Sequence, residues 1–214
     1  MEIILAENHG FCYGVKRAVE MANEAANSDG KSYTLGPIIH NPQVVGRLES
    51  KGVSPIQEVA DIDEGTMIIR SHGVGPAIYA EAEEKGLHIL DATADAIKSR
   101  GLNKVALLGT KFTMSDNFYR DGLIVRGITP IVPNESAQNE IHRIIFDELC
   151  VGKFLPQSKA FYLDTIEFLR KQGAEGVILG CTEIGLLVNQ SDFSLPFFDT
   201  AKLHSQMAAE FVLK

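Results

Sequence analysis

Short apolar runs alternate with segments of helical periodicity along the whole chain. A short continuous apolar run is typical of a strand that is buried on both faces of a sheet. The helical segments instead repeat apolar residues at spacings of three and four, as Val15, Ala18, Val19 and Ala22 do. The predicted strands cover residues 2–8, 32–38, 65–71, 87–93, 104–110, 129–133, 176–181 and 195–200. Strands separated by helices predict parallel sheets.

Capping residues indicate where several helices begin and end. Asn41 as a cap, Pro42 at the first helical position and Gly52 after the last turn predict one helix. Thr93 predicts the cap of another helix, which ends at Gly101. Further helices are predicted over residues 76–85, 115–125 and about 201–213, and along stripes at 141–149 and 162–169.

These elements predict an α/β fold of two similar lobes. Each lobe is expected to hold a roughly four-stranded parallel sheet with helices on both faces. A chain of 214 residues is long enough for two lobes of roughly a hundred residues each. The boundary is predicted near residue 95, which gives a first lobe of residues 1–95 and a second lobe of residues 96–214. No charged or low-complexity linker separates them, so we expect the lobes to pack closely.

Composition narrows the classes of function. The formal net charge is −8 and the acidic residues are scattered, so the chain lacks the basic surface that binds nucleic acids and anionic membranes. No apolar run approaches the ~18 residues of a membrane span, and the N-terminus lacks the pattern of a secretory signal. Three widely spaced cysteines do not form a disulfide framework. We therefore expect a cytoplasmic protein with no nucleic-acid or membrane partner.

The strand ends of the second lobe carry candidate chemistry, because ligands bind at the carboxyl ends of strands in such sheets. Cys181 ends a strand and precedes a predicted helix that begins with Thr182 and Glu183. A helix N-terminus lowers the pKa of a thiol, so Cys181 fits a base or a nucleophile. Cys181 is equally consistent with a small residue that is buried in the turn and has no chemical role. His204, in the last helix, fits either a residue that orients Cys181 or a surface cap.

A second strand end in this lobe carries Gly109, Thr110 and Thr113. The backbone N–H groups and hydroxyls of this loop fit a cradle for a carboxylate. An ordinary capped turn is the alternative. Cys150 lies on a helical stripe and is predicted to be buried in the core, so it is not a candidate site residue.

From about residue 88 to residue 214 the chain resembles the aspartate/glutamate racemase family. The resemblance is carried by HILDATADAI, VALLGTKFTM, GAEGVILGCTEIGLLV and LPFFDTAKLH. It implies a cofactor-independent racemase of acidic amino acids, in which two cysteines act on opposite faces of Cα. It also implies that the final helix returns to pack on the first lobe and that two copies pair as a homodimer.

The resemblance assigns roles to matching residues of the second lobe. They are Cys181 as one of the two cysteines, Thr110, Thr113 and Thr182 at the substrate carboxylate, and Glu183 and His204 in support. The family's other cysteine would follow the third strand of the first lobe. This chain has Arg70, Ser71 and His72 there, so half of the cysteine pair is missing.

The first lobe has its own candidate residues. Cys12 follows a strand and precedes a helix, so it is consistent with a thiolate or a metal ligand and equally with a small residue buried in the turn. His40 and His72 follow strands and could each donate a hydrogen bond to an anion, although a single loop histidine is usually structural. The segments ENHGFCYGVKRAVE, GPIIHNPQVV and IIRSHGVG resemble the N-terminal domain of the 4-hydroxy-3-methylbut-2-enyl diphosphate reductase family, over about residues 1–93. This resemblance implies that Cys12 ligates an iron–sulfur cluster and that the two histidines contact the substrate diphosphate.

Two of the three cluster ligands of that family are absent from this sequence. One would follow LDAT, where this chain has Ala94, and the other belongs to a later domain. Thiolates hold such clusters, and Cys12 alone cannot hold one stably, so we expect no cofactor. We interpret the sequence as an engineered or recombined hybrid that lacks the complete activity of either parent family.

Two alternatives stay open, and both involve a small anionic molecule. In the first, Cys181 performs residual racemase-type proton transfer at Cα of aspartate or glutamate, with Cys12 or His72 as a weak second acid. In the second, His40 and His72 bind phosphate or diphosphate. Iron–sulfur reductase activity is not expected in either case.

Overall fold

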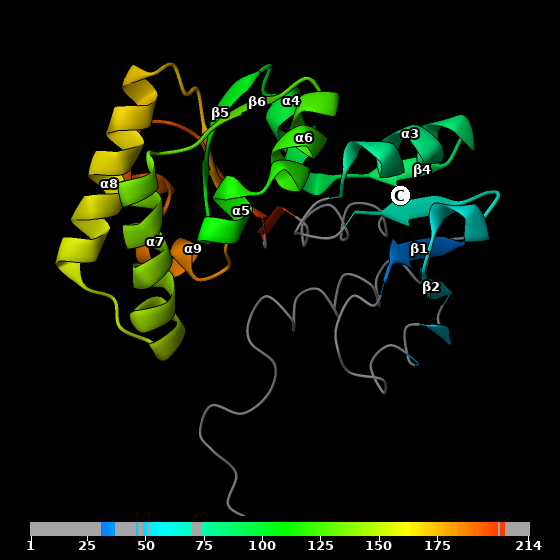
Figure 1. The fold of residues 1–214 in the computed structure, drawn as a ribbon, viewed down its shortest axis with the longest axis horizontal. Coiled ribbons are helices and arrows are strands. Elements are labelled where there is room, and N and C mark those ends of the chain that lie inside the picture. Colours follow the sequence, from blue (N-terminus) through cyan, green and yellow to red (C-terminus); the bar gives the residue numbers. More distant parts are fainter. Residues whose placement is uncertain are drawn as a thin grey trace, which may run out of the picture.

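The computed structural model describes residues 31–36, 46, 49–50, 52–69, 74–200 and 202–203. These residues form two four-stranded sheets in which every pairing is parallel. One sheet lies in each lobe (Figure 1). The strand orders are β2-β1-β3-β4 and β6-β5-β7-β8. The predicted α/β fold of two similar lobes is therefore confirmed.

The first sheet contains three predicted strands and one that the apolar pattern missed. Its strands are β1 (Ser32–Leu35), β2 (Val53–Ile56), β3 (Thr66–Ile68) and β4 (His88–Leu90). β2 was missed because its sequence, VSPI, breaks the apolar run with a serine and a proline. Pro55 is tolerated because β2 lies at the edge of the described sheet, where a missing N–H costs little. The predicted strand at residues 2–8 lies outside the described residues.

The core of the first lobe lies between this sheet and the helix α3 (Pro76–Glu84). Proline at the first position of α3 has the backbone angle that a helix start requires. Tyr79 and Ala82 of α3 pack with Met67 of β3 in one buried cluster. The short 3-10 helix η1 (Val59–Asp61) adds Val59 to this cluster.

The second sheet follows the predicted pattern strand for strand. It consists of β5 (Lys104–Leu108), β6 (Thr129–Ile131), β7 (Val177–Leu179) and β8 (Phe197–Asp199). Its helices are α4 (Ala92–Ser99), α5 (Lys111–Ser115), α6 (Asn117–Val125), α7 (Glu135–Asp147), α8 (Pro156–Lys171) and α9 (Ile184–Leu187). Among the described residues, this part also contains two 3-10 helices, η2 (Leu149–Val151) and η3 (Gln190–Asp192). The helix predicted over about 201–213 lies almost entirely outside the described residues.

Side chains along β5 alternate between two cores. Val105 and Leu107 pack in the cluster that holds residues of α4 and α6. Ala106 and Leu108 pack in the cluster that holds residues of α7 and α8. This alternation follows from the two-residue period of a strand. Helices therefore cover both faces of the second sheet, as predicted.

Three local predictions were wrong. The N-cap of α4 is Asp91 rather than Thr93, because Oδ1 of Asp91 accepts a 3.1 Å hydrogen bond from the N–H of Ala94. The helix α5 was not predicted as a separate helix, since its first three residues, 111–113, lie in the segment interpreted as a loop and Ser115 was predicted to begin the next helix. Cys150 is exposed rather than buried. The helix α7 ends at Asp147, and the turn into η2 takes Cys150 off the helical stripe.

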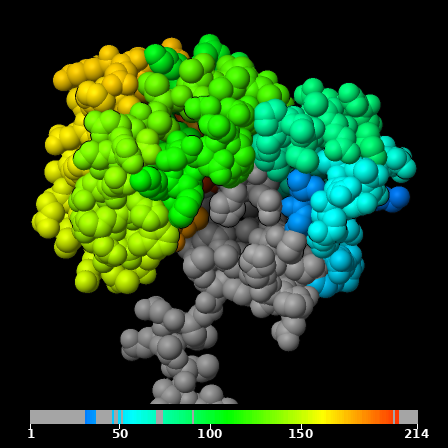
Figure 2. All heavy atoms as spheres, in the orientation of Figure 1, coloured from blue at the N-terminus to red at the C-terminus, as the bar shows by residue number. Residues whose placement is uncertain are grey.

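The two lobes meet where α6 packs against the segment that leads into α3. A Cβ atom on Gly122 would lie 2.6 Å from the carbonyl oxygen of Val74, so the close approach requires glycine. In the space-filling view the green surface of α6 meets the teal surface of α3 (Figure 2). No helix in the described part of the chain is long and apolar enough to cross a membrane.

Candidate functional site

The carboxyl ends of β5 and β7 meet at one edge of the second sheet. The N–H of Gly180 donates a 2.7 Å hydrogen bond to the carbonyl oxygen of Leu108. A Cβ atom on Gly180 would lie 3.0 Å from that oxygen, and one on Gly109 would lie 3.0 Å from Cβ of Thr113. Glycine at both positions therefore lets the loop after β5 pack directly on the turn that carries Cys181.

Thr110 and Thr113 form a capped turn at the start of α5. Oγ1 of Thr110 accepts a 3.3 Å hydrogen bond from the N–H of Thr113, and the two hydroxyl oxygens share a hydrogen bond at 3.1 Å. Between them, Lys111 donates its N–H to Nδ1 of His142 at 3.2 Å. The structure thus shows the capped turn that was one of the two interpretations. Carboxylate binding by Gly109, Thr110 and Thr113 stays a prediction.

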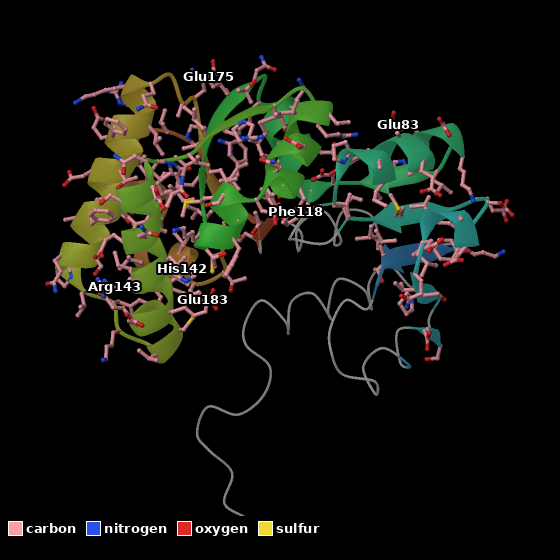
Figure 3. All side chains as sticks on the ribbon, in the orientation of Figure 1. Glu83, Phe118, His142, Arg143, Glu175 and Glu183 are labelled. Atoms are coloured by element: carbon pink, nitrogen blue, oxygen red, sulfur yellow. The ribbon has the colours of Figure 1, made fainter. Side chains whose placement is uncertain are left out.

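Cys181 lies directly after β7 with its thiol bonded to a carboxylate. Sγ of Cys181 donates a 2.9 Å hydrogen bond to Oε2 of Glu183, and Oγ1 of Thr182 donates to the same oxygen at 2.8 Å. Glu183 is labelled in the lower part of the second lobe, below His142 (Figure 3). The structure therefore brings together three residues that the sequence placed in one site.

Burial, followed by the hydrogen bond and the charge of Glu183, raises the pKa of the Cys181 thiol to about 12. The expectation of a lowered pKa is therefore wrong. The helix α9 starts only at Ile184 and has four residues, so it supplies little positive potential to the sulfur. The thiol also faces an anion rather than a cation. At neutral pH the thiol is protonated and acts first as a proton donor.

The end of β8 supports this turn from the neighbouring strand. Oγ1 of Thr200 donates a 3.1 Å hydrogen bond to the carbonyl oxygen of Leu179. A Cβ atom on Gly185 would lie 2.7 Å from Oδ2 of Asp199, so α9 packs closely on the end of β8. His204 follows shortly after but lies outside the described residues, so its supporting role stays a prediction.

The first-lobe candidates also lie outside the described residues. They are Cys12, His40 and His72, together with Arg70 and Ser71 at the position of the missing cysteine. Their roles stay predictions. Within the part of the chain that the structure describes, no group of three or more His, Cys, Asp and Glu side chains is placed to hold a metal ion.

Tyr162 is a residue of this region whose importance the sequence did not indicate. It was predicted only as part of the apolar stripe of a helix. The structure places it on α8, fully buried in the cluster against which Cys181 packs. The helical spacing predicts that the ring of Tyr162 is buried, but it does not predict where the hydroxyl lies. Only the packing shows that Tyr162 and Cys181 belong to the same region.

Two family models match the chain. The model described as LytB protein matches residues 3–106, and the model described as Asp/Glu/Hydantoin racemase matches residues 78–208. The second match covers more than half of the chain. The chain belongs to the Asp/Glu/Hydantoin racemase family.

Two solved structures share the racemase-like fold. A Yersinia pestis protein assigned as an Asp/Glu racemase is 31% identical, with a TM-score of 0.62, over 93% of this chain and 77% of its own. An aspartate racemase homologue from Pyrococcus horikoshii OT3 is 32% identical, with a TM-score of 0.62, over 80% of this chain and 72% of its own. The arrangement of the two lobes is therefore that of the racemase family.

The first half of the chain matches a different family. The 4-hydroxy-3-methylbut-2-enyl diphosphate reductase of Geotalea uraniireducens (strain Rf4) is 55% identical over 98 residues, which are 46% of this chain and 35% of that protein. The chain thus spans about a third of the length of the curated relatives it matches. The two family matches overlap at residues 78–106. The chain is a two-part chimera, LytB-like in its first part and racemase-like in its second.

Proposed function

We propose that this chimera lacks the complete activity of either parent family and retains one half of a racemase-type acid–base site at Cys181. The observation that supports this is the 2.9 Å hydrogen bond from the Cys181 thiol to Glu183 at the carboxyl ends of β5 and β7. A racemase removes a proton from one face of Cα and adds a proton to the other. Cys181 serves one face. The position that matches the other cysteine carries Arg70, Ser71 and His72 in this sequence.

This half-site supports slow exchange of the Cα proton of an acidic amino acid. Glu183 relays the thiol proton to solvent, and the thiolate then takes the Cα proton, which leaves the electron pair on Cα and a thiol at Cys181. That thiol exchanges its proton with solvent and returns a solvent proton to the same face of Cα, which restores the amino acid and the thiolate. Because the pKa of Cys181 is about 12, little thiolate forms at neutral pH and the exchange is slow.

The substrate carboxylate is assigned to the strand ends that surround the thiol. Gly109, Thr110 and Thr113 follow β5, and Thr182 follows β7, so their polar groups meet at one edge of the sheet. Aspartate and glutamate are the substrates suggested by the family match. His204 is proposed to support Cys181, and a homodimer is proposed from the family resemblance.

Reductase chemistry does not fit the residues present. The reductase resemblance implies a cluster ligand at position 94, where this chain has Ala94. Ala94 is fully buried in the first turn of α4 and packs in the core of the second lobe, and its methyl group offers no ligand atom. With Cys12 as the single matching ligand, an iron–sulfur cluster is not held, and we propose no cofactor. Anion binding by His40 and His72 is compatible with this, and it is supported by the LytB match, which covers both histidines.

Deuterium exchange tests the proposal. Aspartate or glutamate is incubated with the full chain in D2O, and loss of the Cα proton signal is followed by NMR. We expect slow exchange above the buffer background, no such exchange in Cys181→Ala, and exchange that is retained in Cys150→Ala, whose side chain is exposed on η2. Exchange that persists in Cys181→Ala, or the absence of exchange above the background, would show that Cys181 is not the acid–base group.

A further inference from the structure

Tyr162 is buried beside the Cys181 turn with a hydroxyl that has no partner in the described part of the chain. Its side chain is 0% exposed, and its phenol oxygen makes no hydrogen bond to any described residue. A buried hydroxyl without a partner costs free energy. Phenylalanine would fill the same space without that cost. A hydrogen bond that the hydroxyl makes in another state of the site would explain why this position carries tyrosine rather than phenylalanine.

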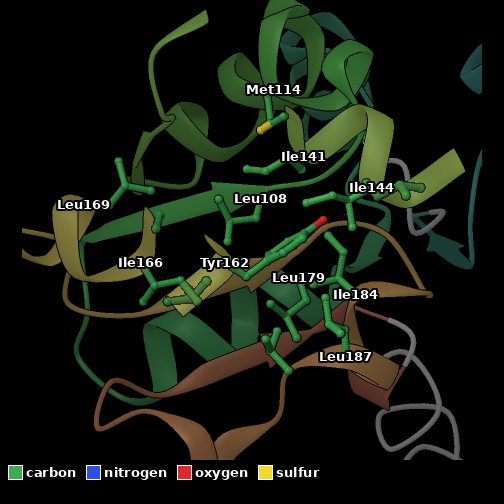
Figure 4. Close-up of a cluster of buried hydrophobic side chains, with 14 of the residues drawn as sticks. Leu108, Met114, Ile141, Ile144, Tyr162, Ile166, Leu169, Leu179, Ile184 and Leu187 are labelled. Carbon is green, nitrogen blue, oxygen red and sulfur yellow. The ribbon is translucent and has the colours of Figure 1, made fainter. Parts of the chain in front are cut away.

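The hydroxyl is directed toward the end of the cluster that adjoins Cys181. Figure 4 shows the phenol oxygen on the side of the ring where Ile144 and Ile184 lie. Ile184 begins α9 directly after the turn at residues 181–183, and Cys181 packs against the same cluster. Besides burial, the charges of Cys181 and then of Glu148 raise the pKa of Tyr162. The phenol is therefore within electrostatic reach of both acids and stays protonated.

Of these two acids, Glu148 already has its hydrogen-bond donors. Its Oε1 accepts a 2.8 Å hydrogen bond from Arg143, and its Oε2 accepts one from the hydroxyl of Ser158. Cys181 differs, because its protonated thiol is a donor in this state and donates a hydrogen bond to Glu183. Once that proton is lost, the sulfur becomes an acceptor inside a half-buried site.

We propose that Tyr162 is a positioning residue whose hydroxyl donates a hydrogen bond to the Cys181 thiolate after a rotation of the cysteine side chain. The inference rests on the proposed function, because it concerns the state in which Cys181 has lost its proton. Among the described residues, the titratable groups that act on the thiol are Glu183 from its own turn, Cys150 from η2 and Tyr162 from α8. Glu183 repels a thiolate, and a phenol is a stronger donor than a thiol. Of these three groups, Tyr162 is thus the donor best suited to stabilise the thiolate.

Site-resolved alkylation of the full-length Tyr162→Phe variant tests this inference. The three cysteines are labelled with iodoacetamide between about pH 7 and pH 10 and quantified separately by peptide mass spectrometry. We expect Cys181 to react about tenfold more slowly in the variant, because the thiolate has lost a donor. Cys12 and Cys150 serve as internal controls with unchanged rates. Tyr119→Phe is the matched control, since Tyr119 is also buried but lies in the cluster on the other face of the sheet.

Stability separates this role from a purely structural one. The unfolding temperature of Tyr162→Phe is expected to be unchanged or higher, because the deleted hydroxyl has no partner in the resting state. An unchanged Cys181 rate profile, or a lower unfolding temperature, overturns the inference. Alkylation needs no substrate. A slower Cys181 reaction in Tyr162→Phe therefore supports the inference even if Cα exchange fails, and that failure counts against the proposed function alone.

Discussion

The hydroxyl of Tyr79 donates a 2.6 Å hydrogen bond to Oδ2 of Asp91, whose other oxygen accepts the N–H of Ala94 and caps α4. One buried carboxylate thus ties α3 of the first lobe to the first helix that packs in the core of the second. All three residues lie in the segment 78–106, which both family models match. This contact between the two parts of the chimera therefore lies within a segment that resembles both families.

The Tyr79–Asp91 hydrogen bond is expected to stabilise the fold. In Tyr79→Phe, Oδ2 of Asp91 stays buried and loses its donor, which is expected to lower the free energy of unfolding by about 1–3 kcal/mol. Urea denaturation measures this difference. Tyr162→Phe is the matched control, because it deletes a buried hydroxyl without a described partner. An equal loss of unfolding free energy in the two variants would show that the Tyr79 hydroxyl contributes no more to stability than a hydroxyl without a hydrogen-bond partner.

The close approach at Gly122 is expected to limit substitution at the lobe junction. In Gly122→Ala the new Cβ atom would lie 2.6 Å from the backbone oxygen of Val74, so α6 must move away from the first lobe. We expect a loss of about 1–3 kcal/mol in unfolding free energy. Gly46→Ala is the control, since an added Cβ there meets no described atom within 4 Å. A Gly122→Ala protein as stable as the unchanged chain would contradict the packing of α6 on the first lobe.

The carboxylate of Glu183 is expected to suppress the reactivity of Cys181. After burial, the hydrogen bond and the charge of Glu183 raise the pKa of this thiol, so Glu183→Gln lowers that pKa. Alkylation of Cys181 at about pH 8 should then be roughly tenfold faster. Glu175→Gln is the control, because that exposed carboxylate accepts from the N–H groups of Asn103 and Lys104 at the other end of β5. An unchanged or slower rate in Glu183→Gln would mean that the carboxylate does not act on the thiol.

The same thiol makes stability depend on pH. The pKa of Cys181 rises from 9.0 to about 12 on folding, so the folded state binds this proton more tightly than the unfolded state. The resulting stabilisation is fully present below about pH 9 and is lost as the pH rises toward 12. We expect the unfolding free energy to fall less steeply across this window in Cys181→Ala than in the unchanged chain. Parallel pH profiles of the two proteins would indicate an ordinary thiol pKa in the folded state.

Most of the strands could be predicted from the sequence, because β5 and β7 are unbroken apolar runs with helices between them. β2 could not, since Ser54 and Pro55 hide an edge strand whose pairing depends on β1. Helix boundaries were less certain, as the cap at Asp91 shows, because a cap depends on local backbone angles.

The chemistry of the site was only partly readable from the sequence. The order Cys181, Thr182, Glu183 identified the turn after β7 as a candidate site. The direction of the thiol pKa shift could not be predicted, because it depends on burial and on the 2.9 Å distance from Sγ to Oε2 of Glu183. Both quantities are set by tertiary packing rather than by spacing along the chain.

The stereochemistry of the exchanged amino acid tests most directly whether the site is one-sided. L-Aspartate is incubated with the full chain in D2O. The two enantiomers are then separated by chiral chromatography, and the deuterium content of each is measured by mass spectrometry. A half-site returns the deuteron to the face from which the proton left, so we expect deuterated L-aspartate and no D-aspartate above the buffer control. Deuterated D-aspartate that forms as fast as the exchange, and that disappears in Cys181→Ala, would reveal a second acid–base group opposite Cys181 and contradict a half-site.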